Sequence, residues 1–201
     1  MRKLLLCVPM MLLLAGCSPA KVSQAEELAL GLRGEYLEMT ACSAHLFVTA
    51  DYGQRVYDYE MDAVLEGEEL TLALTAPETV AGMTAHLSEG EGQLEYEGVW
   101  VETGTLDENG LTPLSAFSAM LEAARGGYIT ACSLEEEENL LRVDCGDPTA
   151  SPGEGREVTL WFEPSTRNLV RGEVSVDGFR VILCECTDFV KADPVNLGPV
   201  S

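Results

Sequence analysis

The sequence predicts an α+β domain, mainly of antiparallel β-sheet. We expect about ten or eleven strands in a curved, incomplete barrel, with an N-terminal and a central helix over its concave face. Three observations support this fold class. Apolar and polar residues alternate along many short segments, turn signals separate these segments, and two other segments have helical spacing. A sheet of so many strands tends to curl, and its apolar face needs a covering layer.

The first helix is expected over residues 23–38, where Ser23 and Glu26 form a capping box. Its apolar residues recur at helical spacing: Ala25, Leu28, Ala29, Leu32 and Tyr36. The second helix is expected to begin at Thr112 and Pro113 and to stop at the glycine pair 126–127. Its apolar stripe consists of Leu114, Phe117, Met120, Leu121 and Ala124.

The other segments alternate with period two, which is typical of strands with one buried face. The expected strands before the second helix are 41–50, 54–66, 70–74, 83–87, 94–97 and 99–106. Those after it are 128–134, 139–145, 158–162, 169–176 and 179–187. Asp177-Gly178 is a signal for a tight hairpin turn. The order is therefore a helix, a group of strands, a helix and a second group of strands.

The N-terminus has the pattern of a lipoprotein signal peptide. Arg2 and Lys3 precede an apolar run of eleven residues, 4–14, whereas a membrane-spanning helix needs about 20. The run ends in Leu-Ala-Gly-Cys at 14–17, which resembles the lipobox of bacterial lipoproteins. That resemblance implies cleavage before Cys17 and its modification by acyl chains such as palmitate. The alternative is a short buried helix that ends in a cysteine.

We expect four segments: a signal peptide over residues 1–16, a tether over 17–22, one domain over 23–190 and a C-terminal tail over 191–201. After cleavage, ten basic and 34 acidic side chains leave a formal net charge of −24. Such a charge disfavours nucleic acid and anionic lipid headgroups as partners. Membrane contact is therefore expected through the lipid on Cys17, at the extracytoplasmic face of the cell membrane.

Five further cysteines belong to the domain: Cys42, Cys132, Cys145, Cys184 and Cys186. An odd number leaves at least one without an intramolecular partner, and the spacing leaves open which, if any, form disulfides. Cys184 and Cys186 share one face of an expected strand, which disfavours a bond between them. Neither His45 nor His86 has zinc-ligand spacing to a cysteine, so we expect no metal and no cofactor.

The sequence has no recognisable catalytic motif. It lacks G-x-S-x-G, H-E-x-x-H and a glycine-rich phosphate loop. Both histidines lie opposite the more apolar phase of their strands and are expected on the surface of the sheet. The acidic run 135–138 could attract a cation, but we expect it to be a solvated hairpin tip that protects strand edges. The protein is therefore expected not to be an enzyme.

The order of elements resembles the LolA/LolB/LppX superfamily of lipid-binding envelope proteins. The matching segments are 47–53 (FVTADYG), 77–83 (PETVAGM), 94–98 (LEYEG), 111–114 (LTPL) and 162–166 (FEPST). With the lipobox and the acidic composition, they resemble most closely the LolA-like lipoproteins of spore-forming clostridia, which include the germination lipoprotein GerS. The resemblance implies a lipid-binding half-barrel. The chain has no clear equivalent of the family's ligand-gating arginine, although Arg55 lies in the phase of Tyr57 and Tyr59.

Two binding functions compete on these grounds. In the first, the anchored protein docks an envelope or spore cell-wall protein during sporulation or germination. In the second, its concave face carries lipid or lipoprotein acyl chains. The candidate lining residues are Tyr57, Tyr59, Met61, Leu70, Leu72, Leu74, Phe117, Met120 and Leu121. These residue types suit a packed core as well as a lipid cavity. The acidic surface and the anchor favour docking over a freely diffusing carrier.

Overall fold

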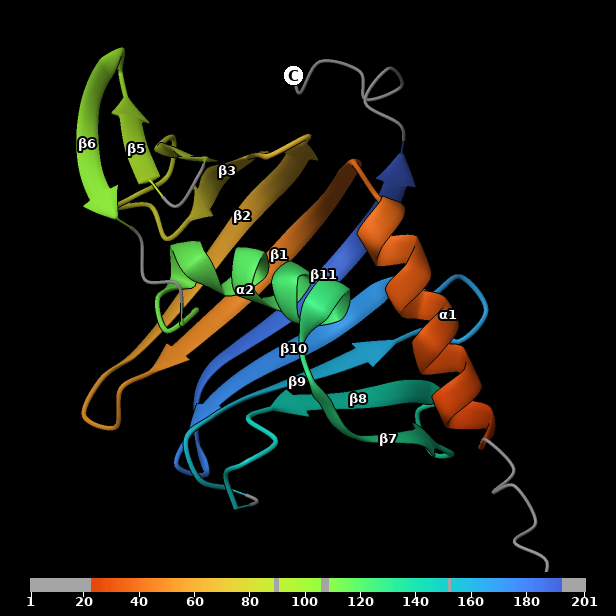
Figure 1. The fold of residues 1–201 in the computed structure, drawn as a ribbon. Coiled ribbons are helices and arrows are strands. Elements are labelled where there is room, and N and C mark those ends of the chain that lie inside the picture. The colour runs from red at the N-terminus through yellow and green to blue at the C-terminus, as the bar shows by residue number, and fades with distance from the viewer. Residues whose placement is uncertain (1–22, 89–90, 106–108, 152, 193–201) are drawn as a thin grey trace, which may run out of the picture.

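The computed structural model describes residues 23–192, apart from 89–90, 106–108 and 152 (Figure 1). The predicted signal peptide 1–16, the lipidation site Cys17, the tether and the tail from residue 193 onward lie outside the described residues. The chain order is α1, β1 to β6, α2 and β7 to β11. Neither α1 nor α2 has the length and hydropathy of a bilayer-spanning segment.

The helices are α1 (Gln24–Glu38) and α2 (Pro113–Gly126). The strands before α2 are β1 (Ala41–Asp51), β2 (Val56–Glu66), β3 (Glu69–Ala76), β4 (Thr84–Ser88), β5 (Glu91–Tyr96) and β6 (Val99–Thr105). Those after it are β7 (Ile129–Glu135), β8 (Leu140–Gly146), β9 (Arg156–Phe162), β10 (Leu169–Val176) and β11 (Phe179–Ala192). The predicted elements are all present. The last strand is longer than expected, because it ends at residue 192 instead of 187.

Both helices begin with the predicted caps. The Ser23 hydroxyl accepts a hydrogen bond from the Glu26 backbone N–H, and the Glu26 carboxylate accepts one from the Ser23 N–H. Thr112 and Ser115 form the equivalent pair at the start of α2. These contacts satisfy donors that the first turn of a helix leaves unpaired.

The two helices also cap each other. Arg125, in the last turn of α2, donates to the carbonyl oxygens of Tyr36 and Met39 at 3.1 Å each, where α1 ends. In return, Arg33 of α1 donates to the carbonyl oxygen of Gly127, just after α2. Carbonyl groups at a helix end have no partner within the helix. The two arginines therefore fix the helices to each other.

All eleven strands form one antiparallel sheet in the order β6-β5-β4-β3-β2-β1-β11-β10-β9-β8-β7. Consecutive strands are neighbours in the sheet, except β6 and β7, which lie at its two ends. The pairing of β1 with β11 joins the two halves of the sheet. Within the described residues, the two end strands β6 and β7 do not pair with each other, so the barrel stays open. We call the part of the sheet made by β4, β5 and β6 the outer wing.

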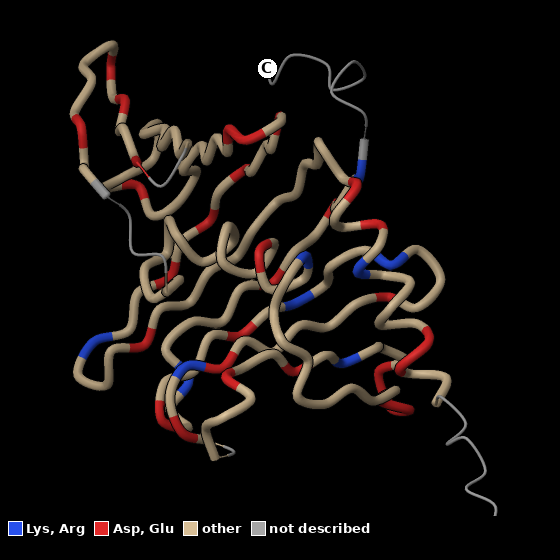
Figure 2. The backbone as a smooth tube through the Cα atoms, in the orientation of Figure 1, with Lys and Arg blue, Asp and Glu red and all other residues tan. Residues whose placement is uncertain are grey.

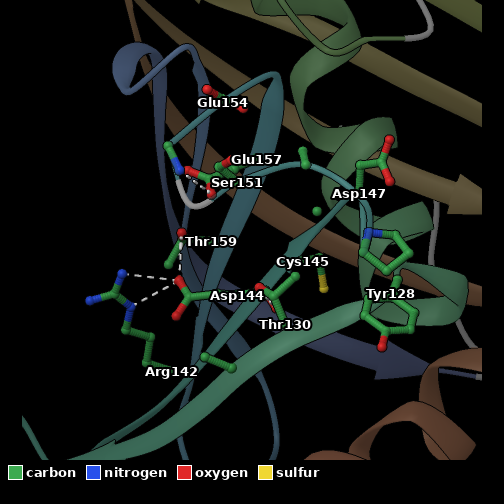
Figure 3. Close-up of a pocket in the computed structure, with 15 residues that line it drawn as sticks. Tyr128, Thr130, Arg142, Asp144, Cys145, Asp147, Ser151, Glu154, Glu157 and Thr159 are labelled. Carbon is green, nitrogen blue, oxygen red and sulfur yellow. Dashed lines mark hydrogen bonds and ion pairs between the residues drawn. The ribbon is translucent and has the colours of Figure 1, made fainter.

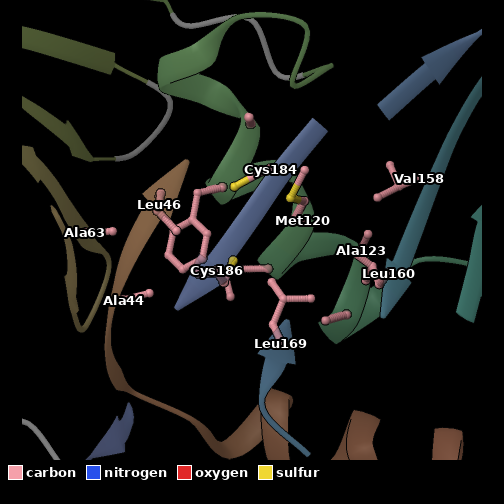
Figure 4. Packing of buried hydrophobic residues seen from close by; sticks show 14 of the residues in the cluster. Ala44, Leu46, Ala63, Met120, Ala123, Val158, Leu160, Leu169, Cys184 and Cys186 are labelled. Carbon is pink, nitrogen blue, oxygen red and sulfur yellow. The ribbon is translucent and has the colours of Figure 1, made fainter. Parts of the chain in front are cut away.

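The core lies between the centre of the sheet and α2. Figure 1 shows α2 lying across the concave face, and it packs against β1, β9, β10 and β11. Phe117, Met120 and Leu121 are at most 2% exposed. Figure 4 shows the surrounding cluster, which includes Leu46 from β1 and both Cys184 and Cys186 from β11. The other helix, α1, packs against α2, β7 and β8. The predicted fold class is confirmed.

Candidate functional site

The nine predicted lining residues divide into two groups. Seven are buried: Met61, Leu70, Leu72, Leu74, Phe117, Met120 and Leu121. The other two remain accessible, since Tyr57 is 38% exposed and Tyr59 is partly buried. All three lining residues of β2 share one face, but Met61 lies deeper in the core. The concave face is therefore filled under α2 and accessible toward the Tyr57 end of β2, where Arg55 donates to the Tyr57 hydroxyl at 3.4 Å.

The accessible apolar surface continues onto the outer wing. Leu72 pairs with Ala85, Ala85 with Leu94, and Leu94 with Val101, so these side chains share the concave face. The pair Tyr96 and Val99 follows on the same face. Exposure rises toward the edge: Leu94 is partly buried, whereas Tyr96 is 48%, Val101 56% and Val99 63% exposed. The helix α2 packs against β1 and β9 to β11. The apolar side chains of the outer wing are exposed because α2 does not cover them.

The convex side of the outer wing also exposes an aromatic residue. Trp100 is 53% exposed, and its ring lies 4.9 Å from the His86 ring, centroid to centroid. The His86 nitrogens lie 3.5 Å from a Glu69 carboxylate oxygen and 3.6 Å from one of Glu95. The edge strand β6 therefore presents apolar side chains on both of its faces. Sequence patterning did not single out Trp100, Val99 or Val101, because alternation does not reveal which strand lies at an edge.

The outer wing belongs to a strongly acidic stretch of the chain. Residues 56–124 contain fifteen Asp and Glu residues and no Lys or Arg. The nearest basic residues in the sequence are Arg55 and Arg125, at the two ends of this stretch. Figure 2 shows acidic residues along the outer wing and the basic ones gathered on the rest of the sheet and near α1. An uncompensated charge of one sign attracts partners of the opposite sign.

A separate polar pocket of about 520 Å³ lies where β7, β8 and β9 meet the loop 147–155 (Figure 3). At its floor, the Asp144 carboxylate accepts hydrogen bonds from Arg142 at 3.0 Å and Thr159 at 2.8 Å. Hydrogen bonds from Thr149 lower the pKa of Asp147. These charged groups already have protein partners. No group of three or more metal-ligating side chains occurs among the residues that the structure describes.

The acidic run 135–138 differs in part from the expected solvated tip. Glu135 accepts a hydrogen bond from the Trp161 indole at 3.0 Å, and Glu138 forms an ion pair with Arg171 at 3.2 Å. The Arg171 guanidinium lies 4.2 Å from the centre of the Trp161 ring, and Arg142 lies 5.5 Å from it. Two of the four carboxylates thus hold a cation–π stack on the convex face in place.

The histidines lie on the convex face, as the alternation predicted. His45 Nδ1 lies 2.7 Å from a carboxylate oxygen of Asp62, its cross-strand neighbour. All five domain cysteines are free thiols. Burial raises the pKa of Cys42 to about 12 and that of Cys145 to about 11. A hydrogen bond with Cys184, together with burial, raises the pKa of Cys186.

No protein-family model matches the sequence, and no curated protein matches it. Solved structures are similar in fold. A DUF1329 family protein of Desulfovibrio piger has 8% sequence identity and a TM-score of 0.50, over 88% of this chain and 95% of that chain. A LolA superfamily protein of Nitrosomonas europaea has 10% identity and a TM-score of 0.43, over 84% and 94%. A chain in the structure of the CwlD amidase in complex with the GerS lipoprotein, from Clostridioides difficile, has 14% identity and a TM-score of 0.42. The match covers 87% of this chain and 100% of that chain.

Proposed function

We propose that this protein is a non-enzymatic lipoprotein of the bacterial envelope, anchored through Cys17, that docks a partner protein on its outer wing. The proposal rests on one observation: the helix α2 leaves the apolar residues of the outer wing exposed. The sheet continues beyond α2 with Tyr96, Val99 and Val101 exposed on its concave side and Trp100 on its convex side. Contiguous exposed apolar surface is characteristic of interaction sites.

The charge of the outer wing indicates what kind of surface would bind there. Carboxylates surround the exposed apolar residues, and residues 56–124 contain no basic side chain. Complementary charge speeds association and disfavours wrong partners. A partner with a basic rim around an apolar contact fits this surface best.

The position of the outer wing suits a tethered protein. Residues 18–22 separate the lipidation site Cys17 from the N-cap Ser23, and the six Cα–Cα steps from 17 to 23 span about 20 Å when extended. In Figure 1, the start of α1 and the β5–β6 hairpin lie near opposite edges of the sheet. An anchor at Cys17 would keep the α1 side near the membrane and leave the outer wing accessible to another envelope protein.

The resemblance of the sequence pattern to clostridial lipoproteins suggests the class of partner. On that basis we propose a cell-wall protein or enzyme that acts in sporulation or germination. The lipoprotein would hold this partner at the membrane surface and would take no part in its chemistry.

Carriage of acyl chains is the second candidate function. The accessible part of the concave face, with Tyr57, Tyr59 and Leu94, is the observation that favours it. Lipid extraction and native mass spectrometry of the purified protein separate the two functions. A lipid that co-purifies reproducibly at one molecule per chain would contradict docking as the main function.

The docking proposal is tested with the full lipid-anchored chain and a double substitution, Val99→Ser with Val101→Ser. Capture of a cell-wall protein from envelope membranes should fall about tenfold or more, since centrally placed apolar contacts dominate interface energies. The matched control is Leu30→Ser with Leu37→Ser on α1, where the two leucines are 62% and 63% exposed. Equal capture by the wild type and the wing variant, or equal loss in the control, would contradict the proposal.

A further inference from the structure

Among the residues that the structure describes, no strand pairs with the outer edge of β6. β6 is the last strand in the sheet order, and its pairing partner among the described residues is β5. The two strands meet at the turn Glu97-Gly98, where both residues have positive φ, 50° and 78°, as a two-residue hairpin turn requires. The pair that closes such a turn is Tyr96 with Val99, and it is hydrogen-bonded. Since bonded and non-bonded pairs alternate along an antiparallel ladder, the backbone groups of Trp100 and Glu102 point to the open edge.

This edge lacks the usual protection. Natural edge strands are shielded by lysines, prolines, bulges or a covering helix. The described strand β6 contains no lysine and no proline, and Glu102 is its one charged residue. Its register irregularity opposite Gly92 and Gln93 lies beyond Glu102. The other end of the sheet differs, because α1 packs against β7.

The side chains of β6 specify what a neighbouring strand would carry. Val99 and Val101 lie on the concave face, and Trp100 and Glu102 lie on the convex face. Directly opposed residues of an added strand share these faces. Aliphatic residues would fit beside the valines. Lysine or arginine would fit beside Trp100 and Glu102, as a cation–π partner of the indole and an ion-pair partner of the carboxylate.

A second copy of this chain does not meet these requirements. Pairing two β6 strands would bring together the acidic side chains of two hairpins, which contain Glu91, Glu95, Glu97 and Glu102. Opposed like charges destabilise a strand pair. The C-terminal segment 193–201 does not fit either, since it has two prolines and no basic residue. The edge therefore fits a segment of a different, basic protein.

We infer that β6 is a strand-addition site, where an extended segment of alternating aliphatic and basic residues joins the sheet through the backbone of Trp100 and Glu102. The inference rests on the proposed docking function and specifies how the partner is bound. Backbone hydrogen bonds supply affinity in this mode, and the alternating side chains supply specificity.

Amide hydrogen exchange tests the site directly. The probe is a peptide of four Lys-Val repeats, added to the full lipid-anchored chain in detergent. Binding should slow exchange at the Trp100 and Glu102 amides by about tenfold or more, since they gain hydrogen bonds. The amides of Val99 and Val101 should change little, because β5 already protects them. A peptide that binds without slowing Trp100 and Glu102 would overturn the inference.

Two control peptides separate strand pairing from charge attraction. The first has the same composition in blocks, four lysines followed by four valines. The second has alternate backbone nitrogens methylated, which removes its donors on one edge. Both should bind at least about tenfold more weakly, equivalent to the loss of one or two hydrogen bonds. Equal binding by all three peptides would mean that charge alone attracts them, and the inference would be wrong.

A proline substitution tests the same edge from the protein's side. The Glu102 N–H points away from β5, so Glu102→Pro removes an outward donor and leaves the β5 ladder intact. Glu102→Ala removes only the carboxylate and should weaken peptide binding a few-fold. Glu102→Pro should weaken it by about a further tenfold, with the Val99 and Val101 amides still protected as evidence of an intact hairpin.

The outcomes distinguish this inference from the proposed function. In one outcome, Glu102→Pro and Glu102→Ala bind the Lys-Val peptide equally well, while Val99→Ser with Val101→Ser still loses capture of the partner. The partner then uses the face of the outer wing, and strand addition is wrong. If neither the edge nor the face of the wing affects capture, both the inference and the docking proposal fail.

Discussion

Met120 of α2 lies directly over Gly172 of β10. A Cβ atom built on Gly172 would lie 2.4 Å from the Met120 Sδ and within 3.0 Å of two further atoms of that side chain. Met120 itself is fully buried. The absence of a side chain at residue 172 thus lets α2 approach the sheet closely and fill the centre of the concave face.

The first prediction concerns this contact. Gly172→Ala should lower the free energy of unfolding by about 1–3 kcal/mol, because the new methyl group overpacks a filled core. Met120→Ala should cost about 2–5 kcal/mol through the cavity that it leaves. In the double variant the glycine substitution should be much less harmful, since its methyl group then has room. Urea unfolding of the four proteins measures this coupling.

Gly34 provides the matched control. It lies in α1, where a Cβ atom would meet nothing within 4 Å. Gly34→Ala should therefore raise stability by about 0.5–1 kcal/mol, because alanine restricts the unfolded chain and favours the helix. If Gly172→Ala raised stability as Gly34→Ala is expected to do, the close approach of Met120 to β10 would not limit packing.

Local features of the sequence predicted the elements well. The capping residues Ser23 and Thr112 start their helices as expected, and Asp177-Gly178 forms the turn between β10 and β11 with positive φ at both residues. Alternation also predicted one buried face for the strand 41–50, and Leu46 and Val48 lie on that face of β1. Each of these features depends on neighbours within a few residues, so a single sequence contains it.

The candidate site could not be predicted in the same way. Tyr57 and Met61 share one face of one strand, yet Tyr57 is 38% exposed and Met61 is fully buried. The difference depends on where α2 crosses the sheet, which the alternation of β2 does not encode. The exposure of Trp100 depends similarly on β6 being an end strand. That position results from the long-range pairing of β1 with β11, which places β2 to β6 in one half of the sheet.

The second prediction concerns acid stability. Glu35 of α1 forms ion pairs with Arg167, in the β9–β10 turn, and with Lys191 of β11 at 2.9 Å. Partial burial would raise the pKa of Glu35, but the hydrogen bonds from Lys191 and Arg167 outweigh it and lower the pKa. A carboxyl whose pKa is lower in the folded state stabilises the protein at pH values above its unfolded pKa of about 4.3. This stabilisation disappears as the pH falls through the pKa of the folded state.

Glu35→Gln should therefore lower the free energy of unfolding by about 0.5–1 kcal/mol at pH 7, allowing for solvent screening of a partly exposed pair. Near pH 3 the variant and the wild type should differ much less. Urea titrations at the two pH values measure this. Glu122→Gln, at an exposed position of α2, is the control and should change stability little at either pH. A loss at Glu35 that is independent of pH would contradict the assigned ion pairs.

The third prediction concerns the contact between the helices. Arg125→Ala should lower the free energy of unfolding by about 1.5–3 kcal/mol, because the last carbonyl groups of α1 lose charged hydrogen-bond partners. Arg125→Lys should recover only part of this, since an ammonium group does not reproduce the fork that bonds Tyr36 and Met39 together.

Arg180→Ala is the control for this prediction. Arg180 forms a surface ion pair with Glu173 at 2.9 Å, and its side chain is 53% exposed, so its removal should cost less than about 1 kcal/mol. Thermal unfolding and amide exchange in α1 measure both effects. If Arg125→Ala were no more harmful than Arg180→Ala, the mutual capping of α1 and α2 would not contribute measurably to stability.

The fourth prediction concerns alkaline stability. Burial raises the pKa of Cys42 to about 12 and that of Cys145 to about 11, whereas an unfolded thiol titrates near 8.5. A raised pKa in the folded state means that the native protein holds its protons longer. The free energy of unfolding therefore keeps its full value below about pH 8, and it falls at higher pH as the thiols of the unfolded chain lose their protons. Under reducing conditions, the free energy of unfolding should decrease between about pH 8.5 and 10, with a slope approaching about 1.4 kcal/mol per pH unit for each buried thiol.

The slope, and not the stability itself, identifies the thiols as the cause. Cys145→Ala removes one titrating group, and its Sγ contact with the Ala123 carbonyl at 3.8 Å, so it should lower stability at neutral pH. It should also reduce the alkaline slope by about one proton, because the alanine has nothing to ionise. Cys42→Ala should reduce it by a similar amount. An unchanged slope in both variants would assign the alkaline loss to other groups, and a flat profile in the wild type would contradict burial of protonated thiols in this core.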